Sequence, residues 1–406
     1  MAAAVVALVW ANVGSDTYER FWSTEVAGRV GSLRLEEDLR HVVNDLLMAL
    51  FFYVVALEIK RELLLGSLRD RRAALVPVAA AIGTMVGAAV VYTAVNARGG
   101  DLRGWAIPIA TDIAFALGAL GLVGTRAPRE LRAFMLTLAV VDDLATIAVI
   151  GVFFTSDLSP AWLAAAAAVA GGVALARALG VRSRAVYGVL ALALWLAVFE
   201  SGVHATIAGV VLGFMTPAVA LRSRTRVSEL LGARLSEAAR SGEVSAKSLL
   251  EASRLAEEAA PPLVRMEERL HPWSAYGVLP VFALANAGVT VSASGIGDAL
   301  TSQVGLGIAL GLVVGAPAGG VLFAWAVVRV GLARVPAGLD WAAIAGVAPL
   351  KGIGFTIAIF ISELAFDERA LQDQAKLAIL VASAAAAAIG VTSLAVRVAA
   401  GSRRAT

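Results

Sequence analysis

The stretch Ala133-Phe-Met-Leu-Thr-Leu-Ala-Val-Val-Asp142-Asp143-Leu-Ala-Thr-Ile-Ala-Val-Ile-Gly151 places two adjacent carboxylates in the middle of an apolar run. Arg132 and Asp157 bound a segment long enough to cross a bilayer as a helix. Asp142 follows Arg132 by ten residues, or roughly 15 Å of helix, and so lies near the midplane of a hydrocarbon layer about 30 Å thick. A charge there costs roughly 2.5–3.5 kcal/mol on insertion scales. The pair therefore predicts a site for a cation or a transferable proton; two protonated or paired acids that only hold helices together are the alternative.

The composition indicates a polytopic helical membrane protein rather than a soluble domain. Hydrophobic residues make up 59% of the 406 residues, and the mean hydropathy is +0.81. The sequence contains no cysteine, which excludes thiol chemistry. It also contains no Walker-type phosphate-binding loop of the kind that proteins driven by ATP use.

Apolar runs joined mostly by short connections predict twelve membrane helices. We expect these helices at residues 2–12, 39–60, 73–97, 104–124, 131–154, 160–180, 185–200, 203–220, 273–291, 303–330, 339–363 and 375–399. Most of the 34 lysines and arginines lie in alternate loops and in the C-terminal tail. This asymmetry predicts that both termini are cytoplasmic.

Two polar segments lie outside these helices, in what we expect to be a single domain over residues 1–406. Residues 221–272 are charged and rich in Ala, Glu and Arg, and we expect them to form a solvated helical insert in the cytoplasm. A regulatory or partner-binding role is the alternative for this insert. Residues 25–34 contain two partly alternating pieces bounded by glycine, which predict a small β-hairpin.

Two of the expected helices carry a proline next to an ionisable residue. Pro108 removes a backbone donor just before Thr111 and Asp112, whose oxygens suit a hard cation or a proton. Pro349 likewise precedes an ionisable residue, Lys351. Two interrupted helices in corresponding positions of two halves are typical of a transporter binding site. A kinked helix with a hydrogen-bonded aspartate is the structural alternative at Asp112.

Lys351 is a candidate partner for the buried acids. Adjacent residues on a helix point about 100° apart, so Lys351 is expected to pair with either Asp142 or Asp143 while the other acid faces a cavity. Alternatively, Lys351 offsets the negative end of a broken helix while Asp112 offsets a positive end. The residues themselves leave this choice open.

Eight further-reaching motifs run along the chain in this order: Val43-Asn44-Asp45-Leu-Leu-Met-Ala-Leu-Phe-Phe, Leu57-Glu58-Ile-Lys60-Arg61-Glu62-Leu, Gly104-Trp-Ala-Ile-Pro-Ile-Ala-Thr111-Asp112-Ile-Ala-Phe-Ala-Leu-Gly118, Val141-Asp142-Asp143-Leu, Ser201-Gly-Val-His204-Ala-Thr, Leu270-His271-Pro-Trp, Ala285-Asn-Ala-Gly288 and Gly352-Ile-Gly-Phe-Thr356. With these motifs the chain closely resembles the NhaA-type bacterial sodium/proton antiporters, over nearly its whole length. These antiporters are inverted-repeat transporters.

The resemblance implies an all-α membrane fold with inverted repeats and two interrupted helices that cross. It implies that residues 20–37 form a periplasmic β-hairpin of a homodimer in the bacterial inner membrane. It also implies exchange of cytoplasmic Na⁺ or Li⁺ for external H⁺ by alternating access, which serves pH and sodium homeostasis. The expected partners are then these ions, protons and membrane lipid, with no cofactor, no enzymatic activity and no nucleic acid.

The same resemblance implies roles for individual residues. Asp143 resembles the principal cation ligand and proton carrier, and Asp142 resembles the neighbour that pairs with a lysine. Thr111 and Asp112 resemble accessory residues at the crossing, and Asp45 resembles a functional acid of the second helix. The residues implied in the response to pH are Glu58, Arg61, Glu62, Glu267, His271 and His204. A solvated helix end, or a structural histidine at position 204, is the alternative for this set.

The chain departs from the family at one important position. Where the family has a lysine before a proline in helix 10, this chain has Ala316 before Pro317, and Lys351 stands instead in helix 11. We therefore hypothesise that Lys351 takes over the partner role. An antiporter of altered ion selectivity or stoichiometry is the first alternative function, and a non-transporting sensor of ions or pH is the second. A cation channel and an intramembrane aspartyl protease fit less well, because a central site between broken helices favours alternating access and a protease needs facing acids on separate helices.

Overall fold

The computed structural model describes residues 2–30, 33–69, 71–122, 129–155, 157–181, 183–220, 227–233, 236, 250, 253, 259–336 and 338–404. These residues are mostly α-helical. Within this described part of the chain, six helices are apolar and long enough to cross a membrane, or eight if each of two bent helix pairs is counted as one span. The straight spans are Leu39–Leu64, Ala73–Asn96, Glu130–Phe153, Pro160–Ala178, Gln303–Arg329 and Arg369–Val396. The protein is therefore a polytopic helical membrane protein, as its composition predicts.

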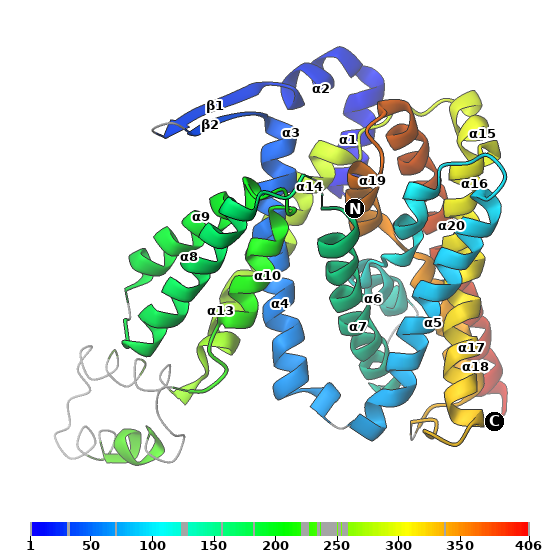
Figure 1. The fold of residues 1–406 in the computed structure, drawn as a ribbon. Coiled ribbons are helices and arrows are strands. Elements are labelled where there is room, and N and C mark those ends of the chain that lie inside the picture. The colour runs from blue at the N-terminus through cyan, green and yellow to red at the C-terminus, as the bar shows by residue number, and fades with distance from the viewer. Residues whose placement is uncertain are drawn as a thin grey trace.

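The helices fall into two groups that lie on opposite sides of the molecule (Figure 1). The first group consists of α1 (Ala2–Val13), α2 (Ser15–Trp22), α3 (Leu39–Val42), η1 (Val43–Leu47), α4 (Met48–Leu64), α8 (Pro160–Ala178), α9 (Arg184–Phe199), α10 (Thr206–Met215), α13 (Pro262–Trp273), η4 (Ser274–Val278) and α14 (Leu279–Asn286). In this group α4 packs along α10, α8 along α9, and α1 along α14.

The second group contains the two bent helix pairs. Its members are α5 (Arg71–Asn96), η3 (Leu102–Ile109), α6 (Ile113–Leu122), α7 (Arg129–Phe153), α15 (Ala293–Thr301), α16 (Gln303–Leu310), η5 (Gly311–Gly315), α17 (Ala316–Arg329), α18 (Trp341–Val347), η6 (Ala348–Gly352), α19 (Phe355–Ala365) and α20 (Arg369–Arg404). Here α17 packs along α5, and α20 packs against α16, η6 and α19. Contacts of α7 with α4 and of α19 with α14 join the two groups.

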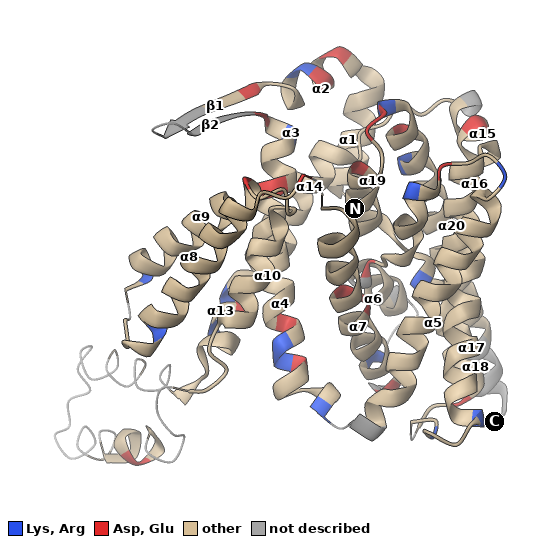
Figure 2. Cartoon of the chain, in the orientation of Figure 1, with Lys and Arg blue, Asp and Glu red and all other residues tan. Residues whose placement is uncertain are grey.

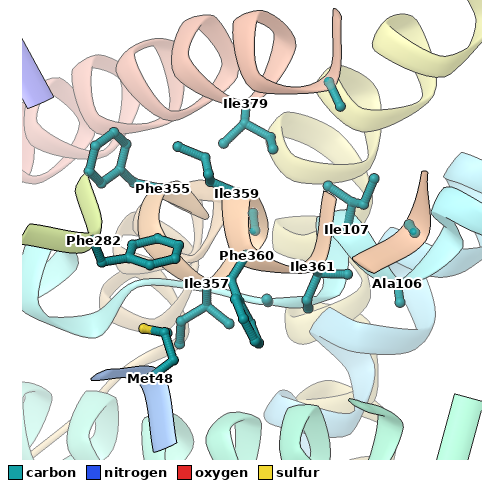
Figure 3. Packing of buried hydrophobic residues seen from close by; sticks show 14 of the residues in the cluster. Met48, Ala106, Ile107, Phe282, Phe355, Ile357, Ile359, Phe360, Ile361 and Ile379 are labelled. Carbon is teal, nitrogen blue, oxygen red and sulfur yellow. The ribbon is translucent and has the colours of Figure 1, made fainter. Parts of the chain in front are cut away.

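The main hydrophobic core surrounds α19 (Figure 3). The Phe360 ring lies 5.7 Å from the ring of Phe52 in α4 and 6.1 Å from that of Phe282 in α14. Nearly every side chain of α19 is buried, which agrees with a helix that is apolar on all its faces. This packing fixes Thr356, in the first turn of α19, deep inside the protein.

A two-stranded antiparallel sheet follows α2 at one end of the molecule, which we call the hairpin end. Strand β1 (Glu25–Val30) pairs with β2 (Leu33–Asp38), with Glu25 opposite Asp38. The sheet begins later than the expected boundary at residue 20, because α2 extends to Trp22. This helix forms because Tyr18 and Trp22, one turn apart, share a buried face.

Three other boundaries differ from expectation. Helix α13 begins at Pro262 and continues through η4 and α14 to Asn286, so the last residues of the expected 221–272 insert belong to this helix. Most of residues 221–258 lie outside the described part of the chain. Helix α10 is shorter than 203–220, since Thr216 precedes a proline and adopts an extended conformation. The last helix begins at Arg369 rather than at residue 375.

Candidate functional site

The site lies where the two bent helix pairs of the second group cross. In the first pair, η3 contains Pro108 and is followed by the extended residue Ala110, before α6 begins at Ile113. In the second pair, η6 contains Pro349 and is followed by the extended residue Ile353, before α19 begins. Each pair bends by more than 40° at its break. The breaks expose backbone groups inside the protein, where these groups need polar partners.

Asp112 forms hydrogen bonds with backbone groups at both helix breaks. Its backbone N–H donates to the carbonyl oxygen of Ile353 across the crossing, at 2.6 Å. Its carboxylate accepts from the backbone N–H groups of Phe115 and Thr356, each at 3.3 Å, and from the Thr356 hydroxyl. A carboxylate is favoured at the positive ends of α6 and α19. Asp112 therefore caps both half-helices, as the alternative interpretation of its sequence context predicts.

Lys351 forms a buried ion pair with Asp142. Its side chain is 2% exposed and that of Asp142 is 1% exposed, and the ammonium nitrogen contacts Oδ2 of Asp142. The ammonium also donates to the Thr111 hydroxyl at 2.7 Å, and this hydroxyl donates in turn to Asp142 Oδ2 at 2.9 Å. Thr84 of α5 donates to the other carboxylate oxygen at 3.4 Å. The geometry thus decides between the two aspartates, and the partner of the lysine is Asp142.

Asp143 differs from its neighbour. Among the described residues, no side chain or backbone group forms a hydrogen bond or ion pair with its carboxylate, and the residue is partly exposed. It lies within electrostatic range of Asp142, Lys351 and Glu58. Figure 2 shows acidic residues within α7, away from the charged ends of the molecule. The α7 helix therefore carries one paired carboxylate and, beside it, one carboxylate whose oxygens are available to an ion.

Gly354 permits the close approach of the two breaks. A Cβ atom added at this position would lie 2.9 Å from the carbonyl oxygen of Ala110 and 3.0 Å from Cδ2 of Leu312. We therefore expect Gly354→Ala to push the half-helices apart and to destabilise the protein by about 1–3 kcal/mol, as overpacking does elsewhere. Thermal unfolding in detergent measures this loss. Gly188→Ala is the control, since nothing surrounds an added Cβ there, and equal stability of the two variants would contradict the account.

Asp45 and His204 lie together, at a distance from the crossing. The Nε2 atom of His204 is 4.0 Å from Oδ1 of Asp45, and both side chains are largely buried. The imidazole ring packs beside Phe360, with 5.3 Å between ring centroids. The structure therefore brings these two predicted residues together as a pair between η1 and the turn before α10.

Apart from His204, the residues expected to respond to pH lie near one another at the other end of α4. Arg61 contacts Glu62 at 3.2 Å and Glu267 of α13 at 3.3 Å. Glu267 precedes the apolar part of its helix, and burial raises the pKa of its carboxyl to about 7 despite the opposing effect of Arg61. Nearby Glu58 joins this group, and the exposed His271 lies within electrostatic range of Glu58.

Sequence reasoning missed Thr84 and Thr356. Each is a buried hydroxyl that bonds to one of the predicted acids. The signal was present, because an isolated threonine in an apolar span needs a partner, but several threonines meet this description. Ala316, at the position of the family's lysine, is buried at the start of α17, and α17 packs against the η6 segment that carries Lys351.

The arrangement has a definite chemical capacity. Asp143, Asp142 and the Thr111 hydroxyl offer oxygen atoms of the kind that hard cations bind. The same carboxylates bind protons, so a cation and protons compete for them. Within the described part of the chain, no three His, Cys, Asp or Glu side chains cluster as a resident metal site would require. The fold is that of a polytopic helical membrane protein, and the candidate site lies at crossed, interrupted helices of the kind that bind substrates in transporters.

Comparisons with known proteins agree with this class. The family model described as Na+/H+ antiporter 1 matches residues 1–394, so the chain belongs to this family. "Na(+)/H(+) antiporter NhaA" of Rhodopirellula baltica is 43% identical over 392 residues, which cover 95% of this chain and 88% of that protein. "Na(+)/H(+) antiporter NhaA 3" of Frankia alni is 44% identical over 97% of this chain and 84% of its own length. "Na(+)/H(+) antiporter NhaA" of Escherichia coli O139:H28 is 43% identical over 97% of this chain and 94% of its own length.

Proposed function

We propose that the protein exchanges cytoplasmic sodium or lithium for external protons at the site around Asp143. The observation that carries this proposal is the Asp143 carboxylate, which has no partner among the described residues, beside an ion-paired Asp142, in a chain that belongs to an antiporter family. Ions and protons compete for the same oxygens, so the binding of one drives out the other. Exchange then needs no energy source other than the two ion gradients.

Each residue of the site has a role in this exchange. Asp143 binds the cation after losing its proton, and Asp142 becomes a second ligand once Lys351 withdraws. Thr111, which now bridges the lysine and Asp142, supplies a neutral oxygen. Asp112 is a positioning residue that holds the two breaks in register. Asp45 with His204 lies on the hairpin side of the site and provides a titratable pair there.

The wider architecture is part of the same proposal. We infer twelve membrane helices arranged as inverted repeats, with one interrupted helix in each, because the two bent pairs mirror one another in their proline and their ionisable residue. The distribution of lysine and arginine supports cytoplasmic termini in a bacterial inner membrane. The two helix groups rock against each other and expose the site to each side in turn. The hairpin extends from the body of the molecule (Figure 1), which suits contact with a second copy in a homodimer.

Proton flux in inverted vesicles tests the function. We expect sodium or lithium, added to vesicles that hold an imposed acidic interior, to dequench a pH-sensitive dye in proportion to the amount of protein. Vesicles without the protein are the control. If no cation, including potassium, produces a signal between pH 6 and 9, the exchange proposal fails and the sensor interpretation replaces it.

Glu267 gives this transport a pH dependence of predictable sign. Burial raises the pKa of Glu267 to about 7, with further contributions from Glu58, Glu62 and Glu268, and Arg61 lowers it. Removing Arg61 therefore raises this pKa further, and a higher pH is needed to ionise the cluster. We expect Arg61→Gln to move the midpoint of activation to higher pH and Glu268→Gln to move it slightly lower. Dye dequenching across pH 6–9 measures both shifts; shifts in the same direction would contradict this role of Glu267.

A further inference from the structure

The hairpin end of the molecule carries a chain of ion pairs that the exchange chemistry does not use. Glu19 of α2 contacts two arginines, namely Arg40 of α3, at 3.3 Å, and Arg369 at the start of α20. Arg40 belongs to the same helix group as Glu19, whereas Arg369 belongs to the other group. The Glu19 carboxylate therefore forms one ion pair within its own group, with Arg40, and one ion pair with the other group, through Arg369.

Glu19 is firmly attached to the first group. Its neighbour Tyr18 is buried, and burial raises the pKa of the Tyr18 hydroxyl to about 12, so the phenol keeps its proton. This hydroxyl is 2.8 Å from the carbonyl oxygens of both Leu284 and Ala285 in α14. The guanidinium of Arg40 lies over the same ring, 5.9 Å from its centroid. The two hydrogen bonds of Tyr18 fix α2, the helix that carries Glu19, on α14.

Arg369 is equally well attached to the second group. It is the first residue of α20, which packs against α16, η6 and α19. About two turns after Arg369, Lys376 of α20 forms a buried ion pair with Glu363 of α19. That pair ties α20 to α19 within one group. The Glu19–Arg369 ion pair therefore joins two elements, α2 and α20, that are each attached to a different group.

We propose that the Glu19–Arg369 ion pair is a latch that joins the two helix groups at the hairpin end and opens in every transport cycle. This latch rests on the alternating access proposed above. Both partners are partly exposed, at 40% and 59% of their side-chain surface, and exposed pairs contribute little to stability. A weak bond is suited to a contact that must break and reform repeatedly. The buried Glu363–Lys376 pair, which stays within one group, has no such need.

Cross-linking tests the latch directly, because the chain has no cysteine of its own. A short, reducible bis-methanethiosulfonate reagent is applied to Glu19→Cys/Arg369→Cys protein in vesicles, and sodium-driven proton flux is measured before and after reduction. We expect the cross-link to lower flux more than tenfold and reduction to restore it. The control pair Glu19→Cys/Arg40→Cys lies within one group, and its cross-link should leave flux unchanged. Full flux through the cross-linked Glu19→Cys/Arg369→Cys protein would overturn the latch.

Single substitutions provide a second test that needs no cross-link. We expect Arg369→Gln to change the transport rate or the half-saturating sodium concentration by up to about fivefold, since an exposed pair is worth at most about 1 kcal/mol. Arg40→Gln removes the other charge from the same carboxylate and should have no such effect. Identical behaviour of the two variants would overturn the latch while leaving the exchange proposal intact. A wild-type protein without flux would instead overturn the exchange itself.

Discussion

Replacing Lys351 by methionine is expected to destabilise the folded protein by about 3–5 kcal/mol, the typical cost of removing one partner of a buried ion pair. The reason is that Asp142, 1% exposed, would keep as partners, among the described residues, only the hydroxyls of Thr111 and Thr84. Methionine preserves most of the volume of the lysine stem, so the loss reports on the charge. Thermal unfolding in detergent at neutral pH measures the effect.

A double variant separates charge from packing. In Asp142→Asn/Lys351→Met both charges are absent, and we expect most of the lost stability to return, because replacing a whole buried pair is often nearly neutral. Asp142→Asn alone should be destabilising, since it leaves the ammonium of Lys351 buried without a counter-charge. A double variant as unstable as the sum of the two single variants would show that the pair does not interact energetically.

We expect the same lysine to set the charge balance of transport. If sodium displaces a proton from Asp143 and Lys351 loses its own proton on leaving Asp142, two protons exchange for one sodium ion and the cycle moves net charge. If Lys351 stays charged throughout, one proton exchanges for one sodium ion. A membrane potential imposed on wild-type and Lys351→Ala vesicles distinguishes these cases, and an equal response of both would contradict a proton-carrying lysine.

Replacing Asp143 by asparagine is expected to reduce exchange to the background level. An amide binds no proton in the working pH range and carries no charge to offset a cation. We expect a loss larger than the roughly 10–100-fold that follows when only a supporting partner of a metal ligand is removed. Stability should be unchanged or higher, because the described residues give this carboxylate no partner to lose. The readout combines sodium-driven flux in vesicles with thermal unfolding.

Asp157 offers a matched control for this substitution. It is the same residue type, it follows α7, and it is exposed. Its backbone has a φ of 47°, a region that asparagine also tolerates. Asp157→Asn should therefore leave flux and stability unchanged. Substantial sodium-driven flux in Asp143→Asn protein would remove Asp143 from the mechanism, whatever the control shows.

The general position of the site was predictable from the sequence because charge is costly inside a membrane. Asp112, Asp142, Asp143 and Lys351 stand out from their apolar surroundings, and Pro108 marks one of the two breaks. Hydropathy likewise predicted a polytopic helical protein. These features depend on local composition, which a sequence displays directly.

The pairing within the site was not predictable in the same way. Whether Lys351 meets Asp142 or Asp143 depends on the rotation of α7 about its axis, and that rotation is set by packing against α4, α5 and η3. The roles of Thr84 and Thr356 depend on contacts between helices that are far apart in the sequence. Helix α2 was not predicted, because its buried face depends on contact with α14, to which the Tyr18 hydroxyl donates hydrogen bonds.

Competition between sodium and protons for one set of carboxylates is the central claim, and the pH dependence of sodium affinity tests it most directly. The measurement is the half-saturating sodium concentration of proton flux at several pH values, with proteoliposomes of defined internal composition. Where the site is mostly protonated, the account predicts that this concentration rises about tenfold for each unit fall in pH when one proton is displaced, because metal binding must release that proton. The maximal rate at saturating sodium should change much less. A half-saturating concentration that stays constant while only the maximal rate follows pH would contradict competition at the site.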